Sequence, residues 1–137
     1  MREFLFRGKR TDCEAWVEGD LLHYESGEMA ICKGFSNYGY EATEIIGRYK
    51  VIPETVGQYT EMSDNNHDGI FEGDIVRCKQ EKNEGICVVR WFNGAFVACP
   101  ISGNLLEMTL HDYWYNDYDL IEVIGNETDN PELLKGE

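Results

Sequence analysis

Apolar and polar residues alternate over short distances along this chain, and runs with the 3.6-residue period of an amphipathic helix are almost absent. Short segments rich in Val, Ile, Tyr, Phe and Trp are separated by Gly, Asn and Asp. Such segments are typical of β-strands joined by turns. The pattern therefore predicts an all-β fold.

Two β-hairpins are predicted from local sequence. The apolar run from Cys87 to Phe92 leads into Asn93-Gly94, and a second apolar run follows up to Pro100. Asn-Gly between apolar strands favours a two-residue turn because both residues tolerate a positive φ. The second hairpin is predicted from Asp20 to Cys32, with its turn at residues 25–28.

A short internal sequence similarity suggests that the chain contains two related β-subdomains. Residues 17–22 (VEGDLL) resemble residues 71–76 (FEGDIV), and each segment precedes a predicted hairpin. In both, Gly-Asp is expected to turn the chain into a strand, with the carboxylate bonding to nearby backbone N–H groups. We expect one domain over residues 1–137 with SH3-like barrel or roll subdomains at 1–50 and 51–137.

The C-terminal segment is the one helical candidate. Asn130 is suited to cap a helix, Pro131 to its first position and Glu132 to its positive end. A short helical turn is therefore predicted there.

Composition is typical of a globular protein, and we expect this one to lie in the cytoplasm. It has 137 residues, of which 42% are hydrophobic. No apolar run approaches the ~20 residues of a membrane helix, and the N-terminal sequence MREFLFRGKR does not resemble a signal peptide. The five cysteines form no C-x-x-C pair, which favours reduced thiols; a zinc site built from scattered cysteines is the alternative.

The chain is strongly acidic. It carries 26 acidic and 12 basic residues, a net charge of −14, and residues 104–137 hold nine acids against one base. Such a charge repels phosphate backbones and argues against direct nucleic-acid binding. Solubility is the plain explanation; a basic host protein partner, or mimicry of nucleic acid, is the functional one.

The acidic turn DNNHDG, residues 64–69, begins like a calcium-binding EF-hand loop. An EF-hand loop needs a Glu at its twelfth position and a helix on each side. The twelfth residue here is Ile75, and the flanking segments resemble strands. We interpret the stretch as a polar β-turn. A weak calcium site is the alternative, with the ligands Asp64, Asn66, Asp68 and Glu72.

Taken together, several segments resemble the YopX family. They are residues 51–60 (VIPETVGQYT) and 71–76, with flanking matches at 6–9, 16–21, 121–126 and 130–134. The resemblance implies a phage- or prophage-encoded, β-rich protein with SH3-like folding that forms homo-oligomers, and it implies no catalytic residue set. The acidic turn departs from the plain polar loop of that family.

Two further groups of residues are candidate binding sites. Four bases lie within the first ten residues, and they suit a neighbour's acidic tail, a phosphate contact or an ordinary charged edge strand. They are Arg2, Arg7, Lys9 and Arg10. An aromatic segment at 111–119 suits the core, a subunit contact or a pocket that stacks a nucleotide-like ligand. Its aromatic residues are Tyr113, Trp114, Tyr115 and Tyr118.

Motifs of catalysis are missing from the sequence. There is no G-x-S-x-G elbow and no phosphate-binding glycine loop, and the three histidines lie far apart at positions 23, 67 and 111. We therefore expect a non-catalytic protein without a cofactor that binds a protein partner as a homo-oligomer. The alternatives are a counter-defence protein that acts by acidic mimicry, one that sequesters a nucleotide-like ligand, and a weak calcium-binding protein.

Overall fold

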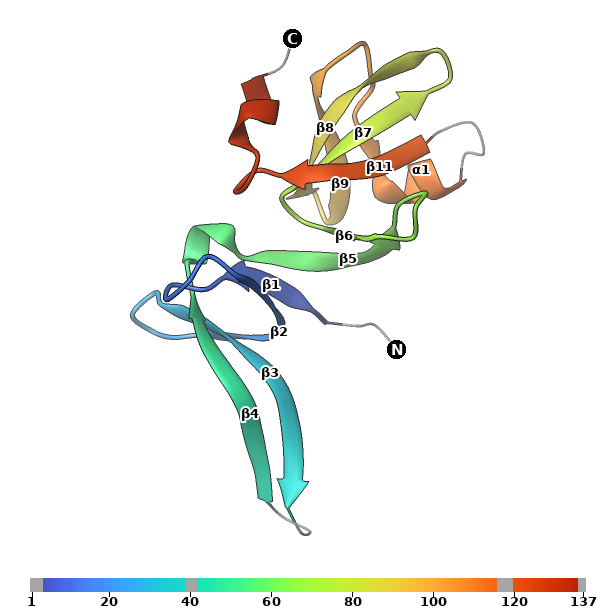
Figure 1. Cartoon of the computed structure of the whole chain (residues 1–137). Coiled ribbons are helices and arrows are strands. Elements are labelled where there is room, and N and C mark those ends of the chain that lie inside the picture. Colours follow the sequence, from blue (N-terminus) through green and yellow to red (C-terminus); the bar gives the residue numbers. More distant parts are fainter. Residues whose placement is uncertain (1–3, 39–41, 116–119, 136–137) are drawn as a thin grey trace. The chain divides into compact units, whose positions relative to one another are not determined.

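The computed structural model describes residues 4–38, 42–115 and 120–135 (Figure 1). The chain divides into two compact units, Met1–Tyr59 and Thr60–Glu137. Strands dominate both, so the predicted all-β fold is confirmed; the SH3-like arrangement stays a prediction. The strands form a sheet of order β4-β3-β2-β1-β5-β6 and a sheet of order β10-β9-β8-β7-β11.

The first unit is an antiparallel arrangement around a small core. Its elements are β1 (Phe6–Lys9), β2 (Trp16–His23), β3 (Met29–Tyr38), β4 (Ala42–Val51), the 3-10 helix η1 (Pro53–Thr55) and the first half of β5 (Gly57–Ser63). The core consists of Val17, Ile31 and Val51, with partly buried apolar side chains around them. The predicted hairpin between Asp20 and Cys32 is confirmed, since these two residues are register partners of β2 and β3.

The two Gly-Asp segments have different roles, which corrects the expectation that both turn the chain. Gly73 has a φ of 91° in the turn before β7, and the Asp74 carboxylate accepts the Phe71 N–H at 2.8 Å, as predicted. Gly19 instead lies inside β2, opposite Phe6. A Cβ at Gly19 would lie 2.1 Å from the Cys32 carbonyl oxygen, so glycine is needed there for close packing of backbones.

The second unit is a meander of antiparallel strands. It contains β6 (Gly69–Phe71), β7 (Asp74–Gln80), β8 (Asn83–Phe92), β9 (Ala95–Ser102), β10 (Met108–Thr109), the helix α1 (Leu110–Tyr115), β11 (Leu120–Asn126) and the 3-10 helix η2 (Pro131–Lys135). Strands β7 to β10 follow one another, and β11 pairs with the free side of β7. The core is built from Ile70, Val76, Cys78, Cys87, Val89, Ala98, Leu110, Tyr113 and Ile121.

Local chemistry explains the elements that the sequence predicted in this unit. Asn93 and Gly94 have φ values of 50° and 81°, as a type I′ turn requires, and they join β8 to β9. The predicted C-terminal helical turn is η2, which begins at Pro131. The Asn130 side chain does not cap it in the expected way, because its Oδ1 accepts the N–H of Asn126 at 3.2 Å.

Helix α1 corrects the expectation that the C-terminus holds the one helical segment. Its sequence, LHDYWY, has one strong helix former, Leu110, and five residues of weaker helix propensity. Thr109 stabilises the start, because its Oγ1 accepts the Asp112 N–H at 3.1 Å. Leu110 and Tyr113, three residues apart and so on one side of the helix, are both buried in the core.

Candidate functional site

The N-terminal bases lie against aromatic rings of their own unit. The Arg7 guanidinium lies 4.9 Å from the ring centre of Trp16, and the Lys9 ammonium lies 5.7 Å from the same ring. Arg10 stacks 4.4 Å from the Tyr49 ring. These contacts are cation–π interactions that hold the cations over β2 and β4. Arg2 lies outside the described residues.

Arg10 also pairs with Asp12 through two hydrogen bonds, from Nε at 2.9 Å and from one terminal nitrogen at 2.7 Å. This bidentate pair lowers the pKa of the Asp12 carboxyl. Strand β1, which holds Arg7 and Lys9, lies between β2 and β5, so these two bases do not lie on an edge strand. The structure therefore places Arg7 and Lys9 against Trp16, and Arg10 against Tyr49, on the first unit.

Only part of the aromatic segment 111–119 is described, and its aromatic side chain in that part, Tyr113, lies in the core. Tyr113 is 4% exposed and lies in the core, and burial raises the pKa of its hydroxyl. Its hydroxyl oxygen accepts a hydrogen bond from Gln80 Nε2 at 2.7 Å. Trp114 and Tyr115 continue α1, but their side chains, and the whole of Tyr118, lie outside the described residues.

Gln80 connects this core tyrosine to an exposed loop. Its amide nitrogen donates to the Leu106 carbonyl at 2.7 Å, and its amide oxygen accepts the Leu106 N–H at 2.8 Å. Both backbone groups of Leu106 are thus held by one side chain that is 9% exposed, while the Leu106 side chain is 75% exposed.

The acidic turn covers the outer edge of β11. Asp64 is 5% exposed, and its Oδ1 accepts the N–H groups of Asn66 and Asp68, each at 2.9 Å. Its Oδ2 accepts the Val123 N–H at 2.8 Å. Asn65 Oδ1 accepts the Ile121 N–H at 2.6 Å, and the Asn65 N–H donates to the Ile121 carbonyl.

Since β11 is the last strand of its sheet, these bonds satisfy backbone groups that an edge strand otherwise leaves open. We call residues Asp64 and Asn65 the edge cap. Among the described residues, no three His, Cys, Asp or Glu side chains are grouped in a way that could hold a metal ion. The Asp64 carboxylate of the calcium-like motif is thus already bonded by backbone N–H groups.

The cysteines are reduced thiols with different surroundings. Cys78 and Cys87 are fully buried on neighbouring strands of the second core. The nearby Cys78 thiol and burial raise the pKa of Cys87. Such thiols pack as small apolar groups and are poor nucleophiles.

The tip of the β8–β9 hairpin is a surface that sequence analysis missed as a site. Trp91 and Phe92 are each 53% exposed, although both are large apolar residues. The Trp91 ring meets Phe96 edge to face, with ring centres 4.8 Å apart and an angle of 68°. Successive residues of a strand face opposite sides, so both faces of the tip are apolar. We call Trp91 and Phe92 the aromatic tip.

An ion pair holds the hairpin at Arg90, the residue that precedes the aromatic tip. Arg90 lies 2.5 Å from the Glu127 carboxylate, and the Glu127 N–H donates to the Gly73 carbonyl at 3.0 Å. The type I′ turn and these contacts restrict the hairpin on either side of the aromatic tip. The signal in the sequence was the pairing of an Asn-Gly turn with an adjacent Trp-Phe.

Comparison with known proteins identifies the family. The family model described as YopX protein matches residues 5–135. The chain belongs to the YopX family. This confirms the resemblance drawn from the sequence.

Two solved structures share the fold. The crystal structure of protein EF1440 from Enterococcus faecalis is 27% identical, with a TM-score of 0.68, and the match covers 98% of this chain and 99% of that one. The structure of YopX from Bacillus subtilis is 17% identical, with a TM-score of 0.54, and the match covers 95% and 97%. No curated protein sequence is significantly similar to the chain. No helix among the described residues is long and apolar enough to cross a membrane.

Proposed function

We propose that this YopX-family chain is a phage- or prophage-derived accessory protein that acts by binding a protein partner in the host cytoplasm, without catalysis, and that it works as a homo-oligomer. The observation that carries the binding role is the aromatic tip. Trp and Phe side chains exposed on a restricted hairpin are typical of protein contact sites, where Trp is among the residues with the largest share of binding energy.

The restraint of the tip favours binding. A rigid aromatic side chain loses little conformational entropy when a partner covers it. Trp91 is held by Phe96 and by the turn, and it still exposes half of its surface. Burial of that surface would contribute favourably to association by the hydrophobic effect.

The polar groups of the chain support a non-catalytic role. The buried carboxylates of Asp64 and Asp74 accept backbone N–H groups, and the buried Gln80 amide bonds to backbone and to Tyr113. His23, His67 and His111 are exposed and lie on three separate segments. General acid–base or nucleophilic catalysis requires such groups to converge on a substrate.

The net charge of −14 favours a partner that is basic. A basic protein would be attracted to this chain at long range, and the aromatic tip would then provide short-range contact.

The test is site-specific photo-cross-linking in host cells. A photo-reactive phenylalanine analogue replaces Phe92, and a control variant carries it at the exposed position Glu14 of the other unit. We expect adducts at position 92 that are missing at position 14. The adduct protein is identified by mass spectrometry, purified and titrated against the wild type, Trp91→Ser and the matched control Leu120→Ser, which removes another half-exposed apolar residue.

Truncation of a hot-spot aromatic costs 2 kcal/mol or more, so Trp91→Ser is expected to weaken binding by roughly thirty-fold, and Leu120→Ser by much less. Equal adducts at both positions, or equal affinities of the three proteins, would refute the tip as the contact site. If Trp91→Ser binds the partner as tightly as the wild type, but the affinity of both falls steeply as the salt concentration rises, the acidic surface is the contact site instead. Native mass by light scattering tests self-assembly independently.

A further inference from the structure

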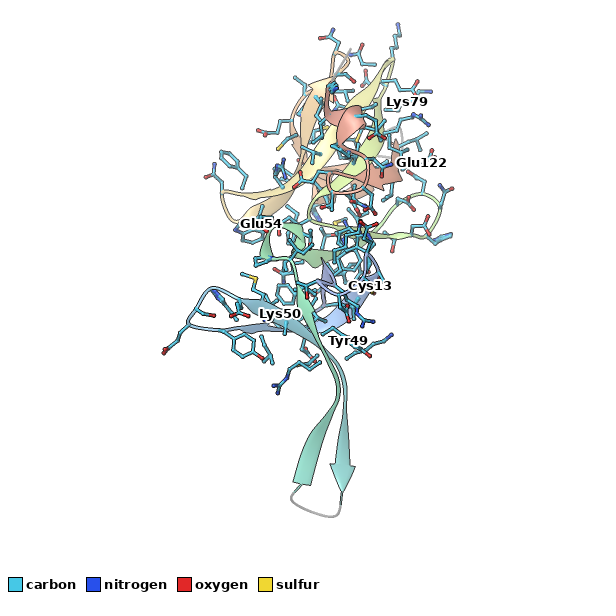
Figure 2. The ribbon with its side chains drawn as sticks, turned by 60° about the vertical axis from the view of Figure 1, so that its left-hand side comes forward. Cys13, Tyr49, Lys50, Glu54, Lys79 and Glu122 are labelled. Carbon is cyan, nitrogen blue, oxygen red and sulfur yellow. The ribbon has the colours of Figure 1, made fainter. Side chains whose placement is uncertain are left out.

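The turn at the end of the β8–β9 hairpin brings together the features that make an asparagine chemically labile. Figure 2 draws the side chains of this hairpin as sticks. Asn93 and Gly94 form the turn, and both are exposed to water. Among the asparagines of the sequence, Asn93 alone is followed by glycine. Because glycine has no Cβ, its backbone nitrogen is open to the preceding side chain, and asparagine is one of the labile residue types of proteins.

The hydrogen bonds of the hairpin leave the Gly94 nitrogen unused. Phe92 and Ala95 are register partners on either side of the turn, and a turn of this type is closed by the bond between those two residues. The Gly94 N–H donates no hydrogen bond within the described part of the chain. A Cβ at Gly94 would meet nothing within 4 Å, so the peptide group between Asn93 and Gly94 has room to rotate. The nitrogen is thus available as a nucleophile.

Hydrogen bonds hold other asparagine side chains in place, but not that of Asn93. Asn65 Oδ1 accepts the Ile121 N–H at 2.6 Å, and Asn126 Oδ1 accepts the Thr128 N–H at 3.0 Å. A side chain bonded in this way must break the bond before its amide carbon can meet the backbone nitrogen of the next residue. The Asn93 side chain makes no hydrogen bond to the residues that the structure describes. Exposure, an available nucleophile and an unrestrained amide therefore coincide at Asn93.

We propose that Asn93 is a site of spontaneous modification, at which the turn asparagine is converted to isoaspartate and aspartate. The Gly94 nitrogen gives its proton to water or hydroxide and forms a bond to Asn93 Cγ. The side-chain nitrogen takes a proton from water and leaves as ammonia, and the product is a five-membered succinimide ring. Water then opens the ring: at the main-chain carbonyl it gives isoaspartate, in which the chain continues through Cγ, and at Cγ it gives aspartate. One water is consumed and one ammonia is released, and no oxidant or cofactor is needed.

The isoaspartate product changes the geometry of the turn. It adds one carbon to the main chain between Phe92 and Gly94, and the length of a hairpin loop sets the register of its strands. Trp91 and Phe96 are register partners whose ring centres lie 4.8 Å apart. A shift of register at the turn separates this pair and loosens the aromatic tip. Aspartate keeps the main chain unchanged, suits the same turn type and adds one negative charge beside the tip.

The modification needs no partner, so its test is independent of the proposed binding function. The folded wild type is incubated at neutral and at mildly alkaline pH and digested, and mass spectrometry of the peptides locates each conversion of amide to acid. Asn83 and Asn104, exposed asparagines followed by Glu and Leu, are internal controls. We expect Asn93 to be converted at least ten-fold faster than either control, and faster at the higher pH, because the Gly94 nitrogen must lose its proton. Chromatography, with the Asn93→Asp variant as the aspartate standard, should show isoaspartate as a second product.

An unchanged Asn93 in the folded protein, under conditions that convert it in the urea-unfolded protein, would overturn the proposal, because the turn would then protect the side chain. Aspartate without isoaspartate would overturn the ring step. The effect on the aromatic tip is measured by hydrogen exchange of the peptide that contains Trp91, in the separated isoaspartate form. We expect faster exchange there than in Asn93→Asp, and equal exchange would overturn the loosening of the tip.

Discussion

Asp64 provides the sharpest test of how the acidic turn works, because the edge cap and a metal site predict different results. The Asp64→Ala substitution removes the acceptor of three backbone N–H groups. Asn66 and Asp68 are exposed, so water can replace their lost bonds at little cost. The N–H of the partly buried Val123 loses a bond to a charged acceptor, which contributes about 1.5–3 kcal/mol. With the loop bonds added, we expect Asp64→Ala to lower the free energy of unfolding by about 3 kcal/mol.

Asp68→Ala is the matched control from the same motif. Asp68 is exposed, and its backbone groups, its N–H and its carbonyl, make the hydrogen bonds of the turn to Asp64. An exposed substitution of this kind changes stability by about 0.5 kcal/mol or less. If the turn were a calcium site, both residues would be ligands and both variants would lose the same calcium-dependent stability.

The assay is urea unfolding with and without millimolar calcium, together with hydrogen exchange followed by mass spectrometry. The edge cap predicts a large loss for Asp64→Ala alone, the same in both buffers, and faster exchange in the peptide that contains Val123. The reasoning is refuted if Asp64→Ala is as stable as the wild type, or if calcium raises the stability of the wild type but of neither variant.

Two further predictions concern the units separately. Gly19→Ala is expected to destabilise the first unit by more than 2 kcal/mol, because the added Cβ would lie 2.1 Å from the Cys32 carbonyl oxygen. Gly27→Ala, in open space with a φ of 94°, should cost only about 1 kcal/mol. Thermal unfolding compares the two variants, and equal losses of stability would contradict the close packing at Gly19. Burial raises the pKa of Tyr113, so the folded state holds this proton more tightly than the unfolded chain, and the stability is complete below about pH 10 and falls as the pH rises above it. Tyr113→Phe should reduce that alkaline loss in urea unfolding at pH 7 to 11, and an unchanged slope would show that other groups cause it.

The elements that could be predicted from sequence are those fixed by neighbouring residues. Asn93-Gly94 forms its turn because both residues tolerate positive φ, and this needs no distant partner. Gly-Asp shows the limit of such reasoning. The same dipeptide forms a turn at Gly73 and an inner strand position at Gly19, and the difference is the Cys32 carbonyl on a neighbouring strand.

Helix α1 and the edge cap were not predicted for a related reason. The helix depends on the burial of Leu110 and Tyr113 in the core, and its local signal is limited to the spacing of Thr109 and Asp112. Asp64 was correctly interpreted as a turn residue, but its bond to Val123 joins positions 59 residues apart. The candidate bases Arg7, Lys9 and Arg10 were found from sequence, whereas their aromatic partners required the structure.

The buried polar side chains of the second unit share one property that bears on function. The carboxylates of Asp64 and Asp74 and the amide of Gln80 all bond to backbone groups, and none of these bonds requires a ligand. Leaving a buried polar group unpaired costs about 1–3 kcal/mol, so these hydrogen bonds are needed for the stability of the fold. The aromatic tip differs from these groups, because its Trp91 and Phe92 side chains are apolar and about half exposed. Contact with another protein chain is what such a surface supports, and this is the basis of our proposal that the chain acts by binding.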